Sequence, residues 1–98
     1  MRAIWLREFG GPEAAAGGVG SMLVQIATRA GARVVGVAGG PRKVALLPGL
    51  GADVAVDYLQ PEWADRVREE MGGVDVVFDG VGGPVARTAF ELLTRAAG

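Results

Sequence analysis

The chain of 98 residues contains no cysteine and no histidine, and its single serine is Ser21. Without cysteine there is no disulfide framework, which fits a cytoplasmic protein. Tetrahedral zinc sites are built mainly from cysteine and histidine, so the sequence predicts no metal site. Ser21 has no histidine to activate it as a nucleophile, and we therefore assign no catalytic residue to this chain.

Strong charge and long apolar runs are also missing. The formal net charge is −1, which argues against a polybasic face for nucleic acid. No apolar run approaches the ~18 residues of a membrane-spanning helix, and residues 1–7 are too few and too charged for a signal peptide. Half of the residues are nevertheless hydrophobic, which suffices for the core of one small domain.

What the sequence does contain is an alternation of short β-branched runs and amphipathic helical patterns. Strands are expected at 33–38, 54–58 and 74–78, the last being the most buried, and helices at 22–30, 41–47, 61–71 and 84–95. The inner face of the first helix is predicted to hold Met22, Leu23, Ile26, Ala27 and Ala30, and that of the third Trp63, Val67 and Met71. Such alternation predicts right-handed βαβ crossovers, and hence an α/β fold with a partial, doubly wound Rossmann parallel sheet flanked by helices.

A glycine-rich loop precedes the first helix. From Ala15 to Gly20 the chain reads A-A-G-G-V-G, the dinucleotide-binding pattern G-x-G-x-x-G with alanine in place of the first glycine. Gly17 lacks a Cβ and lets a pyrophosphate approach the backbone, while Gly20 lets the helix pack closely on its strand. The predicted pyrophosphate site comprises Ala16, Gly17, Gly18, Val19 and Gly20.

A second cluster follows the strand 33–38. NAD-binding Rossmann units carry an Asp or Glu there that holds the ribose 2′-hydroxyl, whereas this chain has Gly39 and Gly40 and then two cations, Arg42 and Lys43. A carboxylate would repel a 2′-phosphate, but cations pair with one. Each such hydrogen bond contributes about 1.5–3 kcal/mol, so we predict NADPH as the cofactor, preferred over NADH by ~10–100-fold. The alternative is that both cations are ordinary solvated residues of a helix.

Several motifs in register point to one family. They are Ala15 to Gly20, Gly31 to Gly36, Gly51 to Asp53 and Val76 to Gly82. With them, residues 14–93 resemble the nucleotide-binding domain of the medium-chain dehydrogenase/reductase superfamily, in its zinc-independent quinone oxidoreductase branch.

The resemblance implies a role for five residues. Lys43 and Tyr58 match the residues that hold the 2′-phosphate of NADPH in that family. The backbone at Gly18 and Val19 matches the part of the loop that meets the pyrophosphate, and Val81 matches a position near the adenosine ribose. Nicotinamide dinucleotide is therefore the expected partner.

Residues 1–13 resemble a different part of the same family, the opening strand of its substrate domain. In the family a GroES-like domain and the first Rossmann strand separate that opening from the glycine loop. We therefore interpret the chain as an internally deleted and C-terminally truncated oxidoreductase. It would consist of a substrate-domain remnant at 1–13 and a partial dinucleotide-binding domain at 14–98.

The missing first strand leaves a vacancy in the expected sheet. In a doubly wound sheet that strand lies between the second and the fourth, so 33–38 and 74–79 would each expose an edge. Residues 3–6 are the spare apolar run that fits this place and gives the order 3-2-N-4, although Arg7 and Glu8 would sit badly in a buried centre. An unpaired edge at 74–79 would favour self-association.

Three functions remain open at this point. The first is an NADPH-dependent quinone or zinc-free alcohol-type oxidoreductase, whose hydride chemistry belongs to the nicotinamide itself. The second is a non-catalytic remnant that binds NADPH weakly at most. The third, an S-adenosylmethionine-binding Rossmann domain, is disfavoured because it would want an acid where Gly39 and Gly40 stand. We take the first as the ancestry and the second as the present activity.

Overall fold

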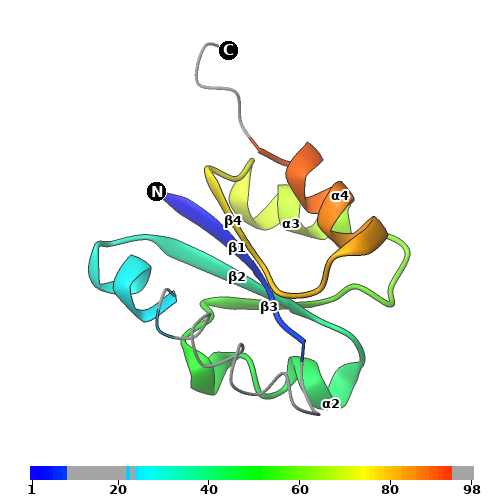
Figure 1. Ribbon diagram of the computed structural model, residues 1–98, viewed down its shortest axis with the longest axis horizontal. Coiled ribbons are helices and arrows are strands. Elements are labelled where there is room, and N and C mark those ends of the chain that lie inside the picture. The colour runs from blue at the N-terminus through cyan, green and yellow to red at the C-terminus, as the bar shows by residue number, and fades with distance from the viewer. Residues whose placement is uncertain (9–21, 23, 94–98) are drawn as a thin grey trace.

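The computed structural model describes residues 1–8, 22 and 24–93, which form a four-stranded parallel sheet with helices on both faces (Figure 1). The strands are β1 (Arg2–Leu6), β2 (Arg33–Ala38), β3 (Val54–Asp57) and β4 (Val76–Asp79), in the spatial order β3-β2-β1-β4. The helices are α2 (Pro41–Val44), the 3-10 helix η2 (Pro48–Leu50), α3 (Trp63–Met71) and α4 (Gly83–Glu91), and residues 24–29 are also helical. The predicted α/β, Rossmann-type sheet is confirmed.

β1 occupies the centre of the sheet. Ile4 pairs in parallel register with Val35 of β2 on one side and with Val77 of β4 on the other. Residues 3–6 are buried, because the central strand of such a sheet is covered on both faces. The order 3-2-N-4 is therefore confirmed, and the N-terminal apolar run takes the place that the first strand holds in a complete doubly wound sheet.

β1 ends where its sequence becomes charged. The backbone N–H of Arg7 still donates to the carbonyl of Val37 at 2.9 Å, but Arg7 is half-buried and Glu8 is exposed. Both residues lie beyond the carboxyl end of β1 rather than inside the sheet. The expected conflict between their charges and a buried centre therefore does not arise.

Alternate side chains of β1 contribute to two cores. Ile4 and Leu6 pack on the face that α3 and α4 cover, while Ala3 and Trp5 pack on the opposite face with the helical segment 24–29. Figure 1 shows the same division, with α3 and α4 on one face of the sheet and α2 on the other. Crossovers on both faces are the arrangement of a doubly wound sheet.

Prolines and glycines set the helix boundaries. α2 begins at Pro41, and Pro48 opens the separate turn of η2, as expected of a residue that cannot continue a helix. α3 buries Trp63 and Val67 as predicted and ends at Gly72 in a left-handed conformation. α4 ends at Glu91, with Leu92 as its C-cap and Leu93 in a bridge to Val74, so the predicted extension of this helix to residue 95 is wrong. None of the helices described is long and apolar enough to cross a membrane.

Two predictions about burial are wrong. β4 is half-buried rather than the most buried strand, because it lies at an edge of the described sheet with only β1 beside it. In the first helical segment Ala27 is buried as predicted, but Met22 and Ile26 of the same predicted face are 63% and 58% exposed, and Val24 is buried instead. Helical periodicity identifies apolar faces, but the angle at which the segment crosses the sheet decides which face is covered.

Candidate cofactor-binding site

The carboxyl ends of the strands lie along one edge of the sheet, because all four strands are parallel. In open α/β sheets ligands bind outside this edge, beside the point where the crossovers change face. Here that point lies between β1 and β4, since the segment before β2 covers one face and α3 and α4 cover the other (Figure 1). A ligand is therefore expected in front of the loops that follow the strands.

The structure brings the described part of the predicted site to this edge. Its members are Gly39, Gly40, Arg42, Lys43, Tyr58 and Val81, which come from the three segments that follow β2, β3 and β4. The predicted pyrophosphate residues, Ala16, Gly17, Gly18, Val19 and Gly20, lie outside the described residues. The described geometry is thus that of the part of the site predicted to hold the 2′-phosphate.

Tyr58 packs directly on Gly39. A Cβ atom built on Gly39 would lie 2.7 Å from both Oη and Cζ of Tyr58, closer than real side chains approach. The backbone N–H of Tyr58 donates to the carbonyl of Ala38 at 3.1 Å, which extends the pairing of β2 and β3 up to the tyrosine. Glycine at position 39 therefore allows the phenol ring to lie across the end of β2, with its hydroxyl beside the turn that follows.

Arg42 and Lys43 lie on α2, directly after that turn. Gly40 has φ 100° and ψ 153°, a conformation that favours glycine, and Pro41 is suited to the first helical position. Neither cation forms an ion pair with another residue in the part of the chain that the structure describes. Arg42 is exposed and Lys43 is half-buried, so both charges can meet an anion in front of the turn.

Asp57 is an acid at this site that sequence reasoning missed. It is the last residue of β3, and its Oδ1 accepts hydrogen bonds from the backbone N–H groups of Gly40 and Leu59, both at 2.9 Å. Asp57 pairs in register with Ala38, the last residue of β2, which is why its side chain reaches the turn after β2. The parallel register therefore supplies a carboxylate where the sequence directly after β2 has none.

The loop after β4 is held against the end of β1. The backbone N–H of Gly80 donates to the carbonyl of Leu6 at 2.8 Å, and a Cβ on Gly80 would lie 3.0 Å from that oxygen. Oδ1 of Asp79 accepts hydrogen bonds from the backbone N–H groups of Val81 at 2.8 Å and Gly82 at 2.9 Å. Asp79 thus shapes the turn that carries the half-buried Val81.

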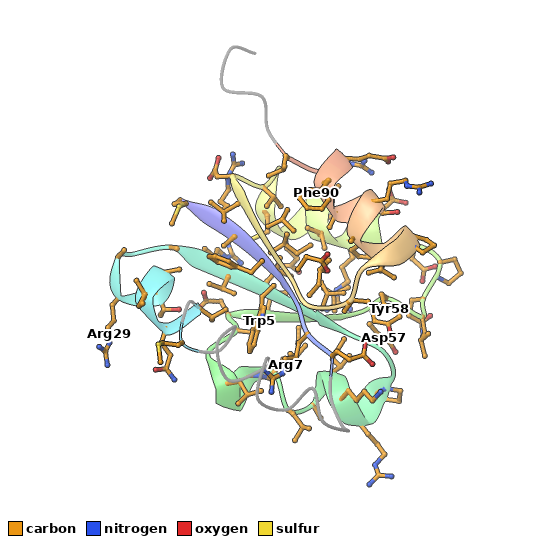
Figure 2. All side chains as sticks on the ribbon, viewed as in Figure 1. Trp5, Arg7, Arg29, Asp57, Tyr58 and Phe90 are labelled. Carbon is orange, nitrogen blue, oxygen red and sulfur yellow. The ribbon has the colours of Figure 1, made fainter. Side chains whose placement is uncertain are left out.

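Arg7 is a second residue at this edge that the sequence did not identify. Its guanidinium carbon lies 5.5 Å from the ring centroid of Trp5, a cation–π distance (Figure 2). Trp5 is buried on the face of β1 that meets the helical segment 24–29. The indole therefore holds the arginine on that face, at the carboxyl end of the central strand.

The fold and this edge define a class of protein. A parallel sheet in doubly wound order, with glycine turns, a tyrosine and cations at its carboxyl edge, is a Rossmann-type unit. A model of the family described as zinc-binding dehydrogenase matches residues 18–98. The chain belongs to this family, within the medium-chain dehydrogenase/reductase superfamily that its motifs resemble.

Proteins of known sequence and structure agree with this assignment. The chain is similar to the proposed NADP-dependent oxidoreductase YfmJ of Bacillus subtilis strain 168, with 43% identity over 87 residues that cover 83% of this chain and 25% of the relative. It is similar to CurA of Vibrio vulnificus in complex with NADPH, with a TM-score of 0.73 and 33% identity over 95% of this chain and 26% of CurA. It is also similar to a mycobacterial quinone oxidoreductase, with a TM-score of 0.71 and 37% identity over 95% of this chain and 27% of the other. The chain thus spans about a quarter of the length of the curated relatives it matches.

The family description names zinc, but the 98 residues contain neither cysteine nor histidine. Within residues 1–8, 22 and 24–93, no three or more His, Cys, Asp or Glu side chains gather where they could hold a metal ion. Similarity to a quinone oxidoreductase of known structure agrees with the zinc-independent branch.

Proposed function

We propose that this chain binds NADPH, with the 2′-phosphate held by Arg42, Lys43 and Tyr58, and that it descends from an NADPH-dependent quinone or zinc-free alcohol-type oxidoreductase. The observation that carries the proposal is the packing of Tyr58 on Gly39, since it sets the phenol hydroxyl beside the turn that leads into both cations. Two similar proteins support it, because YfmJ is named for NADP dependence and CurA was solved with NADPH.

The described residues fit the phosphorylated adenosine end of the cofactor. A phosphate monoester carries a charge of about −1.5 to −2 at neutral pH and offers three acceptor oxygens. One hydroxyl donor lies at the turn after β2, and two cationic residues follow this turn on α2. Gly40 carries no side chain and the nearest atom to a Cβ there would be Leu59 Cδ1 at 3.9 Å, so a ribose can approach the backbone of this turn closely.

The remaining contacts are assigned by the glycine pattern and by the resemblance to the family. Residues 16–20 would meet the pyrophosphate through their backbone, and Val81 would lie near the adenosine ribose. The turn that Asp79 shapes supports the second assignment, because it presents Val81 at the edge of the sheet where the ligand is expected.

We further propose that residues 1–98 bind the cofactor without turning it over. The nicotinamide ring supplies the hydride chemistry when NADPH is bound, and a protein contributes binding and orientation. Among the carboxylates described at this edge, Asp57 and Asp79 each accept two backbone N–H groups and shape turns, and Glu8 is exposed beyond β1. Since the chain spans about a quarter of its relatives, the nicotinamide half and the substrate have no assigned residues.

Two further expectations from the sequence stay predictions. One is a cytoplasmic location, which rests on the absence of cysteine. The other is self-association, which rests on the outer edge of β4, because β4 pairs only with β1 in the described sheet.

Titration of the 98-residue chain tests the proposed function. NADPH, NADH and S-adenosylmethionine are added at low salt while tryptophan fluorescence or the heat of binding is followed. We expect NADPH to bind about 10–100-fold more tightly than NADH, because only NADPH can pair with the cations. Equal affinity for the two nicotinamide cofactors, or tighter binding of S-adenosylmethionine, would overturn the proposal.

A pair of variants tests whether the preference for NADPH depends on Lys43. Lys43→Ala should remove most of the preference for NADPH and leave NADH binding unchanged. Arg29→Ala removes the same charge from the helical segment 24–29, which Figure 2 shows on the far side of the molecule from Tyr58, and it should change neither affinity. NADPH binding that is unaltered in Lys43→Ala would remove the 2′-phosphate assignment.

A further inference from the structure

Asp57 connects the two turns that form the 2′-phosphate half of the site. Its Oδ1 binds the N–H of Gly40 in the turn after β2 and the N–H of Leu59 in the turn after β3. Figure 2 shows Asp57 beside Tyr58 at the end of β3. One carboxylate oxygen therefore holds both turns at once.

These bonds fix the elements that the proposed site needs. Gly40 precedes α2, so an anchored Gly40 N–H sets the start of the helix that carries Arg42 and Lys43. The bond to Leu59 fixes the backbone on the far side of Tyr58, whose ring lies on Gly39. Without Asp57 the turn that leads to the cations would lose a hydrogen bond that ties it to the strand before Tyr58.

The same carboxylate has an electrostatic cost for a phosphorylated ligand. Asp57 carries a formal negative charge and lies at the turn where the proposed 2′-phosphate dianion would bind. Like charges at such a distance repel each other, although water and salt screen the effect at a half-buried position.

We propose that Asp57 is a positioning and specificity-determining residue, which orders the cofactor turns through two backbone hydrogen bonds and limits the preference for NADPH through its charge. This inference rests on the proposed function. Ordering favours binding of both cofactors, whereas the charge opposes only the one with a 2′-phosphate. The two effects therefore separate in variants that keep or remove the hydrogen bonds.

Two substitutions of Asp57 separate the effect of its hydrogen bonds from the effect of its charge. In Asp57→Asn the carboxamide oxygen can still accept both N–H groups but carries no charge, so NADPH affinity should rise about three- to tenfold while NADH affinity stays within about twofold. In Asp57→Ala both bonds are lost, and NADPH affinity should fall about tenfold. Asp53→Asn is the matched control, because Oδ2 of Asp53 accepts the Val34 N–H at the opposite edge of the sheet. It makes the same change in net charge and should leave the ratio of affinities unchanged.

Amide hydrogen exchange of the cofactor-free chain gives an independent measurement. The amides of Gly40 and Leu59 should exchange faster in Asp57→Ala than in the wild type, and should stay protected in Asp57→Asn. If the wild type binds no NADPH, the proposed function fails, yet exchange still decides whether Asp57 orders the turns. The inference itself is overturned if Asp57→Asn binds NADPH no more tightly than the wild type, or if Asp57→Ala leaves both exchange and affinity unchanged.

Discussion

Arg2 and Asp75 bind each other through both backbone and side chain. Oδ2 of Asp75 accepts hydrogen bonds from the Arg2 backbone N–H at 2.8 Å and from its Nε at 3.3 Å, and Oδ1 accepts one from Nη2 at 3.3 Å. The backbone N–H of Asp75 donates in return to the Arg2 carbonyl at 2.8 Å. These bonds join the start of β1 to the residue just before β4, so the N-terminal strand is anchored in its central position.

Acid should weaken this anchor. The side-chain hydrogen bonds from Arg2 hold the pKa of Asp75 below its ordinary value. A group whose pKa is lower in the folded state contributes fully above its unfolded pKa, about 3.9 for Asp, and loses that contribution as pH falls through the folded pKa. We therefore expect the urea midpoint of unfolding to fall between about pH 5 and pH 3, and to fall less steeply in Asp75→Asn.

Asp65→Asn serves as the comparison for that titration. Asp65 pairs with Arg68 on the exposed surface of α3, where an ion pair contributes little. This variant should keep the wild-type slope of the urea midpoint against pH. An identical slope in Asp75→Asn would show that the pairing with Arg2 does not contribute to acid sensitivity.

Ile4→Ala tests the central position of β1. Ile4 is fully buried between Val35 and Val77, so its truncation should lower the free energy of unfolding by about 2–5 kcal/mol, measured with urea. Leu59→Ala removes a side chain that is 65% exposed and should change this free energy by no more than ~0.5 kcal/mol. A loss below ~1 kcal/mol for Ile4→Ala would mean that β1 is not the core strand.

The topology could be predicted from the sequence because few arrangements satisfy it. Strand and helix patterns alternate along the chain, and residues 3–6 were the one spare apolar run for a central vacancy. Burial was harder to predict. Val77 and Phe78 belong to an apolar run, yet their strand lies at an edge of the described sheet and is half-buried. A run of apolar residues does not reveal how many strands lie beside it.

Only the part of the candidate site that is formed by residues close together in the sequence could be predicted. The turn after β2 and its cations follow from local pattern, because the carboxyl edge of a parallel sheet is where ligands bind. Asp57 was not predicted as a site residue, because Gly40, whose N–H it binds, is 17 residues away in the chain. The two residues come together through the pairing of Ala38 with Asp57. The available signal was the acid near the end of the predicted strand 54–58. It indicates a contact with the turn after β2 only when β2 and β3 are known to be neighbours.

Gly39→Ala should disturb the 2′-phosphate half of the site without unfolding the chain. The new Cβ would lie 2.7 Å from the Tyr58 ring, and the ring can swing away because it is the end of a side chain. The hydroxyl would then leave the turn, and NADPH affinity should fall about tenfold with NADH affinity little changed. Fluorescence titration measures both affinities, and circular dichroism checks the fold.

Gly49→Ala is the control for this substitution. A Cβ at Gly49 in η2 would meet nothing within 4 Å, so both affinities should equal those of the wild type. If Gly39→Ala also bound NADPH as tightly as the wild type, the packing of Tyr58 on Gly39 would not matter for the cofactor.

Self-association should depend on protein concentration. β4 has a neighbouring strand on one side only in the described sheet, and edge strands offer unpaired N–H and C=O groups to another chain. Sedimentation velocity over a concentration series should show a mass that rises above 10.0 kDa. A chain that stays monomeric throughout would contradict this prediction.

The 98-residue chain should not oxidise NADPH with quinones or alcohols above the background rate. Hydride transfer needs the nicotinamide and the acceptor about 3–3.5 Å apart in aligned geometry, and this positioning supplies much of the catalysed rate. The chain spans about a quarter of its relatives, and the contacts proposed for its described residues concern the adenosine end of the cofactor alone. Steady-state assays of NADPH consumption against a panel of quinones measure the rate. Gly17→Val provides the control, because a branched side chain in the glycine loop should block cofactor binding. Turnover in the wild type that this variant loses would show that the short chain assembles a working active site.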